Sequence, residues 1–207
     1  MTTEPSEFHS DDVEIVSRDV VFKGFFQLDR IALRHKLFDG GWGREVVREL
    51  FIRGEAIGVL LYDPVHDLIG LVEQFRVGAL NEPQGPWCLE VVAGMIEPGE
   101  TAEEVVEREL QEEANIKAEH LEYICDYLTS PGGTNEKLHL FCGYCDLSQA
   151  GGVHGLAEED EDIRVCVLPS QDVFDTLYDG RCGNAASLIT LQWLQLNRER
   201  IRRERQG

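Results

Sequence analysis

One segment of the chain combines a dense run of like charge with clear signals for a helix. Residues 97–113 contain eight glutamates and a single basic residue, Arg108. Thr101 and the glutamate three residues later, Glu104, form a capping box, in which each side chain satisfies a backbone N–H of the other at the start of a helix. We therefore expect a helix from about residue 102 to residue 114, where Asn115 suits the left-handed C-terminal position.

The expected helix has two different sides. At 3.6 residues per turn, Glu109, Glu112 and Glu113 project from one edge, and an apolar stripe that includes Leu110 lies beside them. Glutamates one turn apart repel one another, and a divalent cation would remove the repulsion. Composition by itself favours another interpretation, an amphipathic helix whose charged side is solvated. The segment is therefore a candidate metal site, and a solvated amphipathic helix is the alternative.

The acidity of the chain is local. The 207 residues include 39 acids and 19 bases, which gives a net charge of −20 at pH 7. Residues 97–113 and the acidic cluster 158–162 contribute −12 of this charge. An inert acidic surface would spread its charge more evenly. Binding to a nucleic-acid backbone needs a basic surface, so we expect no nucleic-acid partner.

Composition also limits the compartment. The hydrophobic content of 43% is enough for a core. The first residues are polar and acidic, unlike a signal peptide, and no apolar run reaches the length of a membrane span. The six cysteines show no disulfide framework, and Cys142 and Cys145 lie in an apolar run that favours buried thiols over zinc ligands. We expect a cytoplasmic protein without a membrane partner.

Two patterns divide the chain near residue 54. Residues 12–51 hold short strand-like runs separated by turn signals, which predicts a small antiparallel β domain over residues 1–54. Residues 55–207 alternate apolar strands and helical segments without the rhythm of a doubly wound sheet. We expect an α/β fold there, with a mixed sheet covered by helices.

The segment 94–116 matches the box of a known family, Gly-x5-Glu-x7-Arg-Glu-apolar-x-Glu-Glu-x-Gly-apolar. The matching residues are Gly94, Glu100, Arg108, Glu109, Leu110, Glu112, Glu113 and Ile116. Asn115 replaces the second glycine, and because asparagine also accepts the left-handed conformation, we expect the loop to be kept. The chain thus resembles the Nudix hydrolases, which implies an α/β/α sandwich and hydrolysis of a diphosphate joined to another group.

Within that superfamily the chain is similar to the bacterial ADP-ribose pyrophosphatases. The segments KGFFQLD, WCLEVVAGMIEPGE, LTSPGGTNE, VHGLAEEDEDIRV and NAASLITLQWLQL carry the resemblance. Pro131 lies fifteen residues past the box, where those enzymes carry a proline. The resemblance implies Mg²⁺-dependent hydrolysis of ADP-ribose to AMP and ribose 5-phosphate, with Mn²⁺ as a substitute ion.

The resemblance also assigns roles at the metal site. It implies metal ligands at the Ala93 carbonyl, Glu109, Glu113 and Glu161, supported by Gly94, Glu100, Arg108 and Glu112. Glu159 would be the general base that takes a proton from the attacking water. Spacing does not distinguish Glu159 from its acidic neighbours Glu158, Asp160 and Asp162. The alternative for this segment is a flexible acidic surface loop.

The substrate contacts implied by the resemblance come from several segments. They are Phe25 and Phe26 from the partner subunit of a homodimer, Arg48, Glu49, Arg53, Arg76, Met95, Ser130 and Glu136. Aromatic rings suit adenine, and arginine can donate two hydrogen bonds to a phosphate. The alternative for the two phenylalanines is core packing in a small sheet. In the implied dimer, residues up to about Gly54 exchange between subunits.

Two other functions stay open from the sequence. One is a sister specificity for GDP-mannose or another sugar nucleotide. The other is a non-catalytic ADP-ribose-binding sensor, which should have lost box glutamates or the base. The chain has neither G-x-S-x-G nor G-x-x-x-x-G-K-[ST], which argues against a serine hydrolase and excludes a P-loop NTPase.

Overall fold

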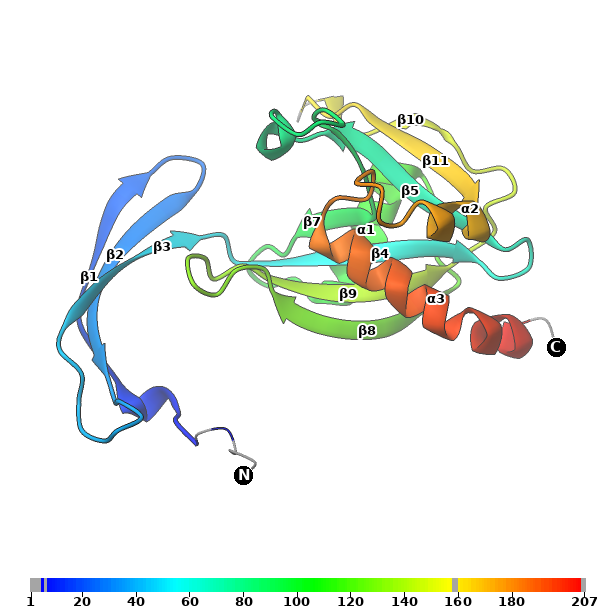
Figure 1. Ribbon diagram of the computed structural model, residues 1–207. Helices are drawn as coiled ribbons and strands as arrows, with labels where there is room; N and C mark the ends of the chain where they lie inside the picture. The colour runs from blue at the N-terminus through cyan, green and yellow to red at the C-terminus, as the bar shows by residue number, and fades with distance from the viewer. Residues whose placement is uncertain (1–4, 6, 158–159, 206–207) are drawn as a thin grey trace. The chain divides into compact units, whose positions relative to one another are not determined.

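The computed structural model describes residues 5, 7–157 and 160–205. The chain divides into two compact units (Figure 1), a smaller one of Met1–Gly54 with Leu128–Glu136 and a larger one of Glu55–Tyr127 with Lys137–Gly207. The domain boundary that the sequence predicts at residue 54 stays a prediction. The smaller unit includes the segment 128–136 in addition.

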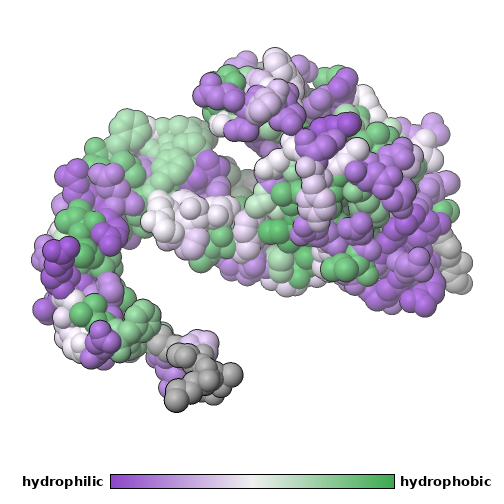
Figure 2. Space-filling view, viewed as in Figure 1, coloured by the Kyte–Doolittle hydropathy of each residue, from purple (hydrophilic) through white to green (hydrophobic). Residues whose placement is uncertain are grey.

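The smaller unit is a three-stranded antiparallel sheet. Its strands are β1 (Val13–Lys23), β2 (Gln27–His35) and β3 (Val46–Ile52), in that order, after the 3-10 turn η1 (Ser10–Asp12). Every side chain of β1 is exposed, and Ile31 is the one buried apolar residue among the described residues of these strands. Figure 2 shows hydrophobic side chains at the surface of this unit. A three-stranded sheet with so little burial is only marginally stable by itself.

The larger unit is built on a mixed sheet. Its eight strands are β4 (Glu55–Asp63), β5 (Leu68–Phe75), β6 (Trp87–Glu90), β7 (Val92–Met95), β8 (His120–Leu128), β9 (Lys137–Tyr144), β10 (Gly152–His154) and β11 (Ile163–Pro169). The order is β10-β11-β5-β4-β9-β8, with β6 paired to β5 and β7 paired to β4. β4 lies at the centre of the sheet, with β5 and β7 on one side and β9 on the other. It runs antiparallel to β5 and β7 and parallel to β9, which makes the sheet mixed.

Helices cover both faces of this sheet. They are α1 (Ala102–Ala114), α2 (Ser170–Asp175) and α3 (Ala185–Arg205), with the 3-10 turn η2 (Val77–Ala79) after β5. Alternation along β4 sends Ile57 and Val59 into the core under α1, and Leu60 and Tyr62 into the core under α2 and α3. The expected α/β architecture with a mixed sheet is confirmed, as are the N-terminal antiparallel sheet and the helix over 102–114.

The fold bears on two expectations that came from composition. Cys142 and Cys145 are buried free thiols, the first in β9 and the second just after it, as expected. Among the described residues, no helix combines the length and the apolar character that crossing a membrane requires.

A carboxylate in the β4–β5 turn ties α3 to the sheet. Asp67 accepts hydrogen bonds from the hydroxyls of Tyr62 and Ser170, both at 2.8 Å, and from Nε of Arg198 at 2.9 Å. Arg202 adds an ion pair at 2.6 Å. Burial opposes the charge of Asp67, but these donors outweigh burial and lower its pKa to about 2. The ionised carboxylate therefore stabilises the folded state.

We predict that Asp67→Asn lowers the free energy of unfolding by about 1–2 kcal/mol at neutral pH. The folded-state pKa of Asp67 is about 2, below the unfolded value of about 4, so this contribution is present above pH 4 and is lost as the pH falls toward 2. Denaturant titrations between pH 7 and 2 should show the difference from wild type shrinking over that window. Asparagine accepts the φ of 60° at this position, so backbone strain does not contribute.

The matched control is Glu199→Gln, which removes an exposed carboxylate from α3 and should change the free energy of unfolding by less than about 0.5 kcal/mol. Equal stability of Asp67→Asn and wild type at pH 7 would contradict the role given to Asp67.

Candidate active site

The glutamate-rich helix begins and ends where its sequence predicts. At the start, the Thr101 hydroxyl accepts a hydrogen bond from the Glu104 N–H at 3.3 Å, and the Glu104 carboxylate accepts one from the Thr101 N–H at 2.8 Å. At the end, Asn115 is left-handed, with φ 52° and ψ 40°, and its N–H donates to the Gln111 carbonyl at 3.1 Å. Asparagine thus takes the conformation for which the family box has glycine.

Two of the box glutamates are buried against β7. The exposed fractions of Glu109 and Glu113 are 9% and 3%. The Glu113 carboxylate accepts a hydrogen bond from the Ala93 N–H at 3.3 Å. A Cβ added at Gly94 would stand 1.9 Å from Oε1 of Glu109, which is well inside van der Waals contact. The glycine therefore makes room for the carboxylate, which gives a physical reason for its place in the box.

Arg108 connects the glutamates to one another. Its Nη1 donates to Oε1 of Glu109 at 2.7 Å and to Oε2 of Glu112 at 3.2 Å. Its Nε donates to Oε1 of Glu100 at 3.3 Å, and its Nη2 donates to the Met95 carbonyl at 3.3 Å. One guanidinium thus joins α1 to the loop before it and to the end of β7.

Burial and like charge make both buried glutamates difficult to ionise. Burial and the charge of Glu109 raise the pKa of Glu113 to about 8, although Arg76 opposes the shift. Burial raises the pKa of Glu109 to about 7 despite the positive charge of Arg108, and the charge of Glu161 adds to both shifts. A divalent cation would stabilise the ionised pair, because hard cations take carboxylate oxygens as ligands. The donor set therefore fits such an ion.

The segment that begins at Gly155 contacts the C-terminal end of α1. The Gly155 N–H donates to the Glu112 carbonyl at 3.2 Å, and the Glu161 carboxylate accepts a hydrogen bond from the Leu156 N–H at 3.1 Å. These contacts bring Glu161 near enough to act on the charge of the buried glutamate pair. Glu159, the predicted general base, lies outside the described residues.

The predicted substrate residues divide between the two units. Arg76 and Met95 belong to the larger unit, and Phe25, Phe26, Arg48, Glu49, Arg53, Ser130 and Glu136 belong to the smaller unit. Within the smaller unit, the Arg53 guanidinium lies 4.6 Å from the centre of the Phe26 ring and forms an ion pair with Glu136 at 2.7 Å. Phe25 is 89% exposed, so the core-packing alternative is wrong for that residue. The substrate assignments themselves stay predictions.

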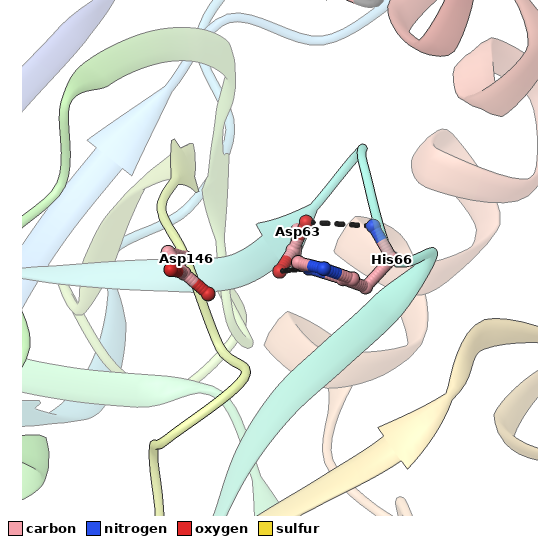
Figure 3. Close-up of side chains that lie close together, drawn as sticks. All are labelled: Asp63, His66 and Asp146. Atoms are coloured by element: carbon pink, nitrogen blue, oxygen red, sulfur yellow. Dashed lines mark hydrogen bonds and ion pairs between the residues drawn. The ribbon is translucent and has the colours of Figure 1, made fainter.

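A different cluster, which the sequence did not single out, lies at the β4–β5 turn (Figure 3). Asp63, His66 and Asp146 each offer a potential metal ligand within 4.8 Å of the others, and the described residues contain no second group of this kind. Asp63 already accepts hydrogen bonds from the N–H groups of Val65, His66 and Leu147 and pairs with Nδ1 of His66, at 2.8–3.1 Å. A cation would have to replace these bonds, so support of the turn explains the cluster.

Comparison with known proteins identifies the family. A match to the NUDIX domain covers residues 52–182. The ADP-ribose pyrophosphatase of Escherichia coli (strain K12) is 44% identical over 200 residues, covering 97% of this chain and 96% of the relative. That of Haemophilus influenzae is 46% identical over 198 residues, covering 94% and 91%. The GDP-mannose pyrophosphatase of Pectobacterium atrosepticum is 31% identical over 188 residues, covering 88% and 94%.

A solved structure shares the fold. The crystal structure of an ADP compounds hydrolase matches with a TM-score of 0.62 over 90% of this chain and 96% of that chain, at 21% identity. The domain match and the relatives together show that the chain belongs to the Nudix family. The prediction of a Nudix hydrolase is thereby confirmed, and such hydrolases generally use a divalent metal ion.

We predict that Gly94→Ala displaces the Glu109 carboxylate, because the new Cβ would overlap three of its side-chain atoms within 2.4 Å. Changes that disturb the orientation of a metal ligand typically weaken metal affinity 10–100-fold, so the dissociation constant for a divalent cation should rise at least about tenfold. Calorimetry measures it. Gly132→Ala is the control, since a Cβ there meets nothing within 4 Å. An unchanged constant in Gly94→Ala would contradict the packing argument.

Proposed function

We propose that this protein hydrolyses the diphosphate of ADP-ribose, with Mg²⁺, to AMP and ribose 5-phosphate. The observation that carries the proposal is the pair of buried glutamates, Glu109 and Glu113, lying against β7 beside Arg108. Carboxylates repel a diphosphate unless a cation bridges the two, so this pair suits a metal-bound diphosphate substrate. The relatives at 44–46% identity are ADP-ribose pyrophosphatases, which supports this substrate over that of the GDP-mannose relative at 31%.

The ligands of the metal in this proposal are the Ala93 carbonyl, Glu109, Glu113 and Glu161. A bound cation polarises the phosphorus centre and lowers the pKa of a bound water. Gly94 leaves the space that the Glu109 side chain occupies, and Arg108 orients Glu109 together with Glu112. Mn²⁺ is the expected substitute, because it accepts the same oxygen ligands.

Glu159 is our candidate for the general base. The segment before it is bonded to α1 through Gly155 and Glu112, and Glu161, two residues later, acts on the charge of the buried glutamate pair. A carboxylate two residues from a proposed metal ligand is a candidate to accept a proton from the attacking water. The hinge freedom of the neighbouring glycines would let this segment close over bound substrate.

We place recognition of the adenosine part in the smaller unit. Phe26, Arg53 and Glu136 combine an aromatic ring, a guanidinium and a carboxylate in one cluster there. Aromatic faces suit adenine, and arginine suits phosphate. The other substrate residues that we propose are Phe25, Arg48, Glu49 and Ser130 in the smaller unit, and Arg76 and Met95 in the larger unit.

We infer a homodimer in which the smaller unit exchanges between subunits. The support is that so little of this unit is buried. All of β1 is exposed, and its apolar side chains, together with Phe25, need a covering surface. A second copy would supply that surface. The cytoplasmic location and the absence of nucleic-acid and membrane partners stay predictions.

A substrate panel tests the proposal. With Mg²⁺, we expect kcat/KM for ADP-ribose to exceed that for GDP-mannose by at least about tenfold. A lead for GDP-mannose or another sugar nucleotide would replace the substrate within the same family. Binding of ADP-ribose without turnover would favour the non-catalytic sensor.

We further predict that Glu159→Gln lowers kcat by about 10²–10⁴-fold, the usual contribution of a general base, with little change in Mg²⁺ affinity. The amide keeps the size of the side chain and cannot accept the proton. Glu158→Gln is the matched neighbour and should retain most of the turnover. Near wild-type turnover in Glu159→Gln, or an equal loss of turnover in Glu158→Gln, would contradict the assignment of Glu159 as the base.

A further inference from the structure

A cavity of about 920 Å³ lies in the larger unit, between the β5–β6 connection and the loop before α3. Its lining includes Arg76, Trp87, Glu90, Arg181 and Asn184. A cavity of this size suits a nucleotide-sized ligand. Family resemblance assigns a role to Arg76 and none to Glu90 or Asn184, so the function of these two polar residues is open.

Glu90, at the end of β6, is a buried carboxylate with a partner on each oxygen. Its exposed fraction is 7%. Oε2 accepts a hydrogen bond from Nε of Arg76 at 2.7 Å, and Oε1 accepts one from Nδ2 of Asn184 at 2.7 Å. Loss of either partner would leave a buried carboxylate oxygen unsatisfied, which destabilises the folded state. Both hydrogen bonds are therefore favoured, and through them Glu90 fixes Arg76 and Asn184.

Asn184 anchors this carboxylate to the start of α3. Its Oδ1 accepts a hydrogen bond from the Ser187 N–H at 2.8 Å, as the side chain of a helix N-cap does. The Ser187 hydroxyl in turn accepts a hydrogen bond from the Val91 N–H at 3.1 Å, directly after Glu90. Glu90 is thus fixed by a frame that joins the first turn of α3 to the β6–β7 junction.

Nε of Arg76 donates a hydrogen bond, and the two terminal nitrogens of its guanidinium are available to a ligand. Among the described residues, the bond from Nε to Glu90 is the one hydrogen bond of the Arg76 side chain, and that side chain is 42% exposed. Its positive charge also opposes the rise in the pKa of Glu113. The two terminal nitrogens of a guanidinium match a phosphate group in geometry and charge.

We propose that Glu90 is a positioning residue for substrate binding: it fixes Arg76 through Nε, so that the terminal nitrogens of Arg76 face the diphosphate. The inference rests on the proposed function in one respect, that Arg76 contacts a phosphate of the substrate. A free arginine side chain loses much rotamer entropy when it binds, and Glu90 removes that loss by fixing Arg76 beforehand. Glu90 thereby contributes to affinity without touching the substrate.

A double-mutant cycle tests this role. Glu90→Gln keeps the shape but has one oxygen for two donors, so it should release Arg76. We expect the KM for ADP-ribose to rise about tenfold in Glu90→Gln, with kcat within about twofold of wild type. In an Arg76→Ala background the same substitution should change KM by less than about twofold, because the residue through which Glu90 acts is gone.

Asn184→Ser gives a second, milder variant. Serine keeps an N-cap acceptor for α3 and removes the donor to Glu90, so KM should rise in the same direction by a smaller factor. Glu199→Gln, an exposed charge removal on α3, should leave KM and kcat unchanged.

Two results would overturn the inference: an unchanged KM in Glu90→Gln, or an equal rise in KM with and without Arg76. The second result would show that Glu90 has only a structural role. The cycle is run with whichever diphosphate substrate the wild type hydrolyses fastest. A wrong assignment of ADP-ribose therefore changes the substrate used and not the comparison that decides the role of Glu90.

Discussion

The proposed active site depends on placing two carboxylates, Glu109 and Glu113, in the interior of the protein. Burial of an ionised group is unfavourable unless donors or counter-charges surround it. Here the compensation is incomplete: Arg108 contacts Glu109, the Ala93 N–H contacts Glu113, and the pKa values of both glutamates still rise, to about 7 and about 8. The unfavourable free energy of ionising both carboxylates is the physical basis for a cation site, because a bound cation would offset it. Gly94 makes the arrangement sterically feasible by leaving space for Glu109.

Other buried carboxylates of the same unit show the opposite balance. Asp67 and Asp63 are also taken out of water, yet their hydrogen-bond donors outweigh burial and lower the pKa of each. Those two residues support the β4–β5 turn and, through Asp67, the docking of α3. The direction of the shift thus separates carboxylates that are satisfied by the protein from the pair that needs a further partner. Each carboxylate oxygen of Glu90 accepts a hydrogen bond within the protein, one of them from an arginine whose terminal nitrogens make no hydrogen bond among the described residues.

Local signals in the sequence predicted a good part of this structure. The capping box at Thr101 and the tolerance of Asn115 for the left-handed conformation predicted where α1 begins and ends, because both act within one turn of the chain. The box pattern identified the family but gave no reason for Gly94, which becomes clear only when β7 lies beside α1. The contact of segment 128–136 with β3, the Asp67 network and the pair of Glu90 with Asn184 join residues far apart in the chain. No periodicity or spacing reports such contacts.

The central claim is that Glu109 and Glu113 form a site for a divalent cation. At pH 7 a carboxyl group with a pKa of about 8 is mostly protonated and one with a pKa of about 7 is about half protonated, so a bound metal ion must displace protons. The direct measurement is a calorimetric Mg²⁺ titration at pH 7 in two buffers of different ionisation enthalpy, which counts the protons released. We expect wild type to release about one proton per bound ion, and Glu113→Gln to bind Mg²⁺ more weakly and release fewer. Mg²⁺ binding without proton release in wild type, or equal affinity in Glu113→Gln, would contradict the claim.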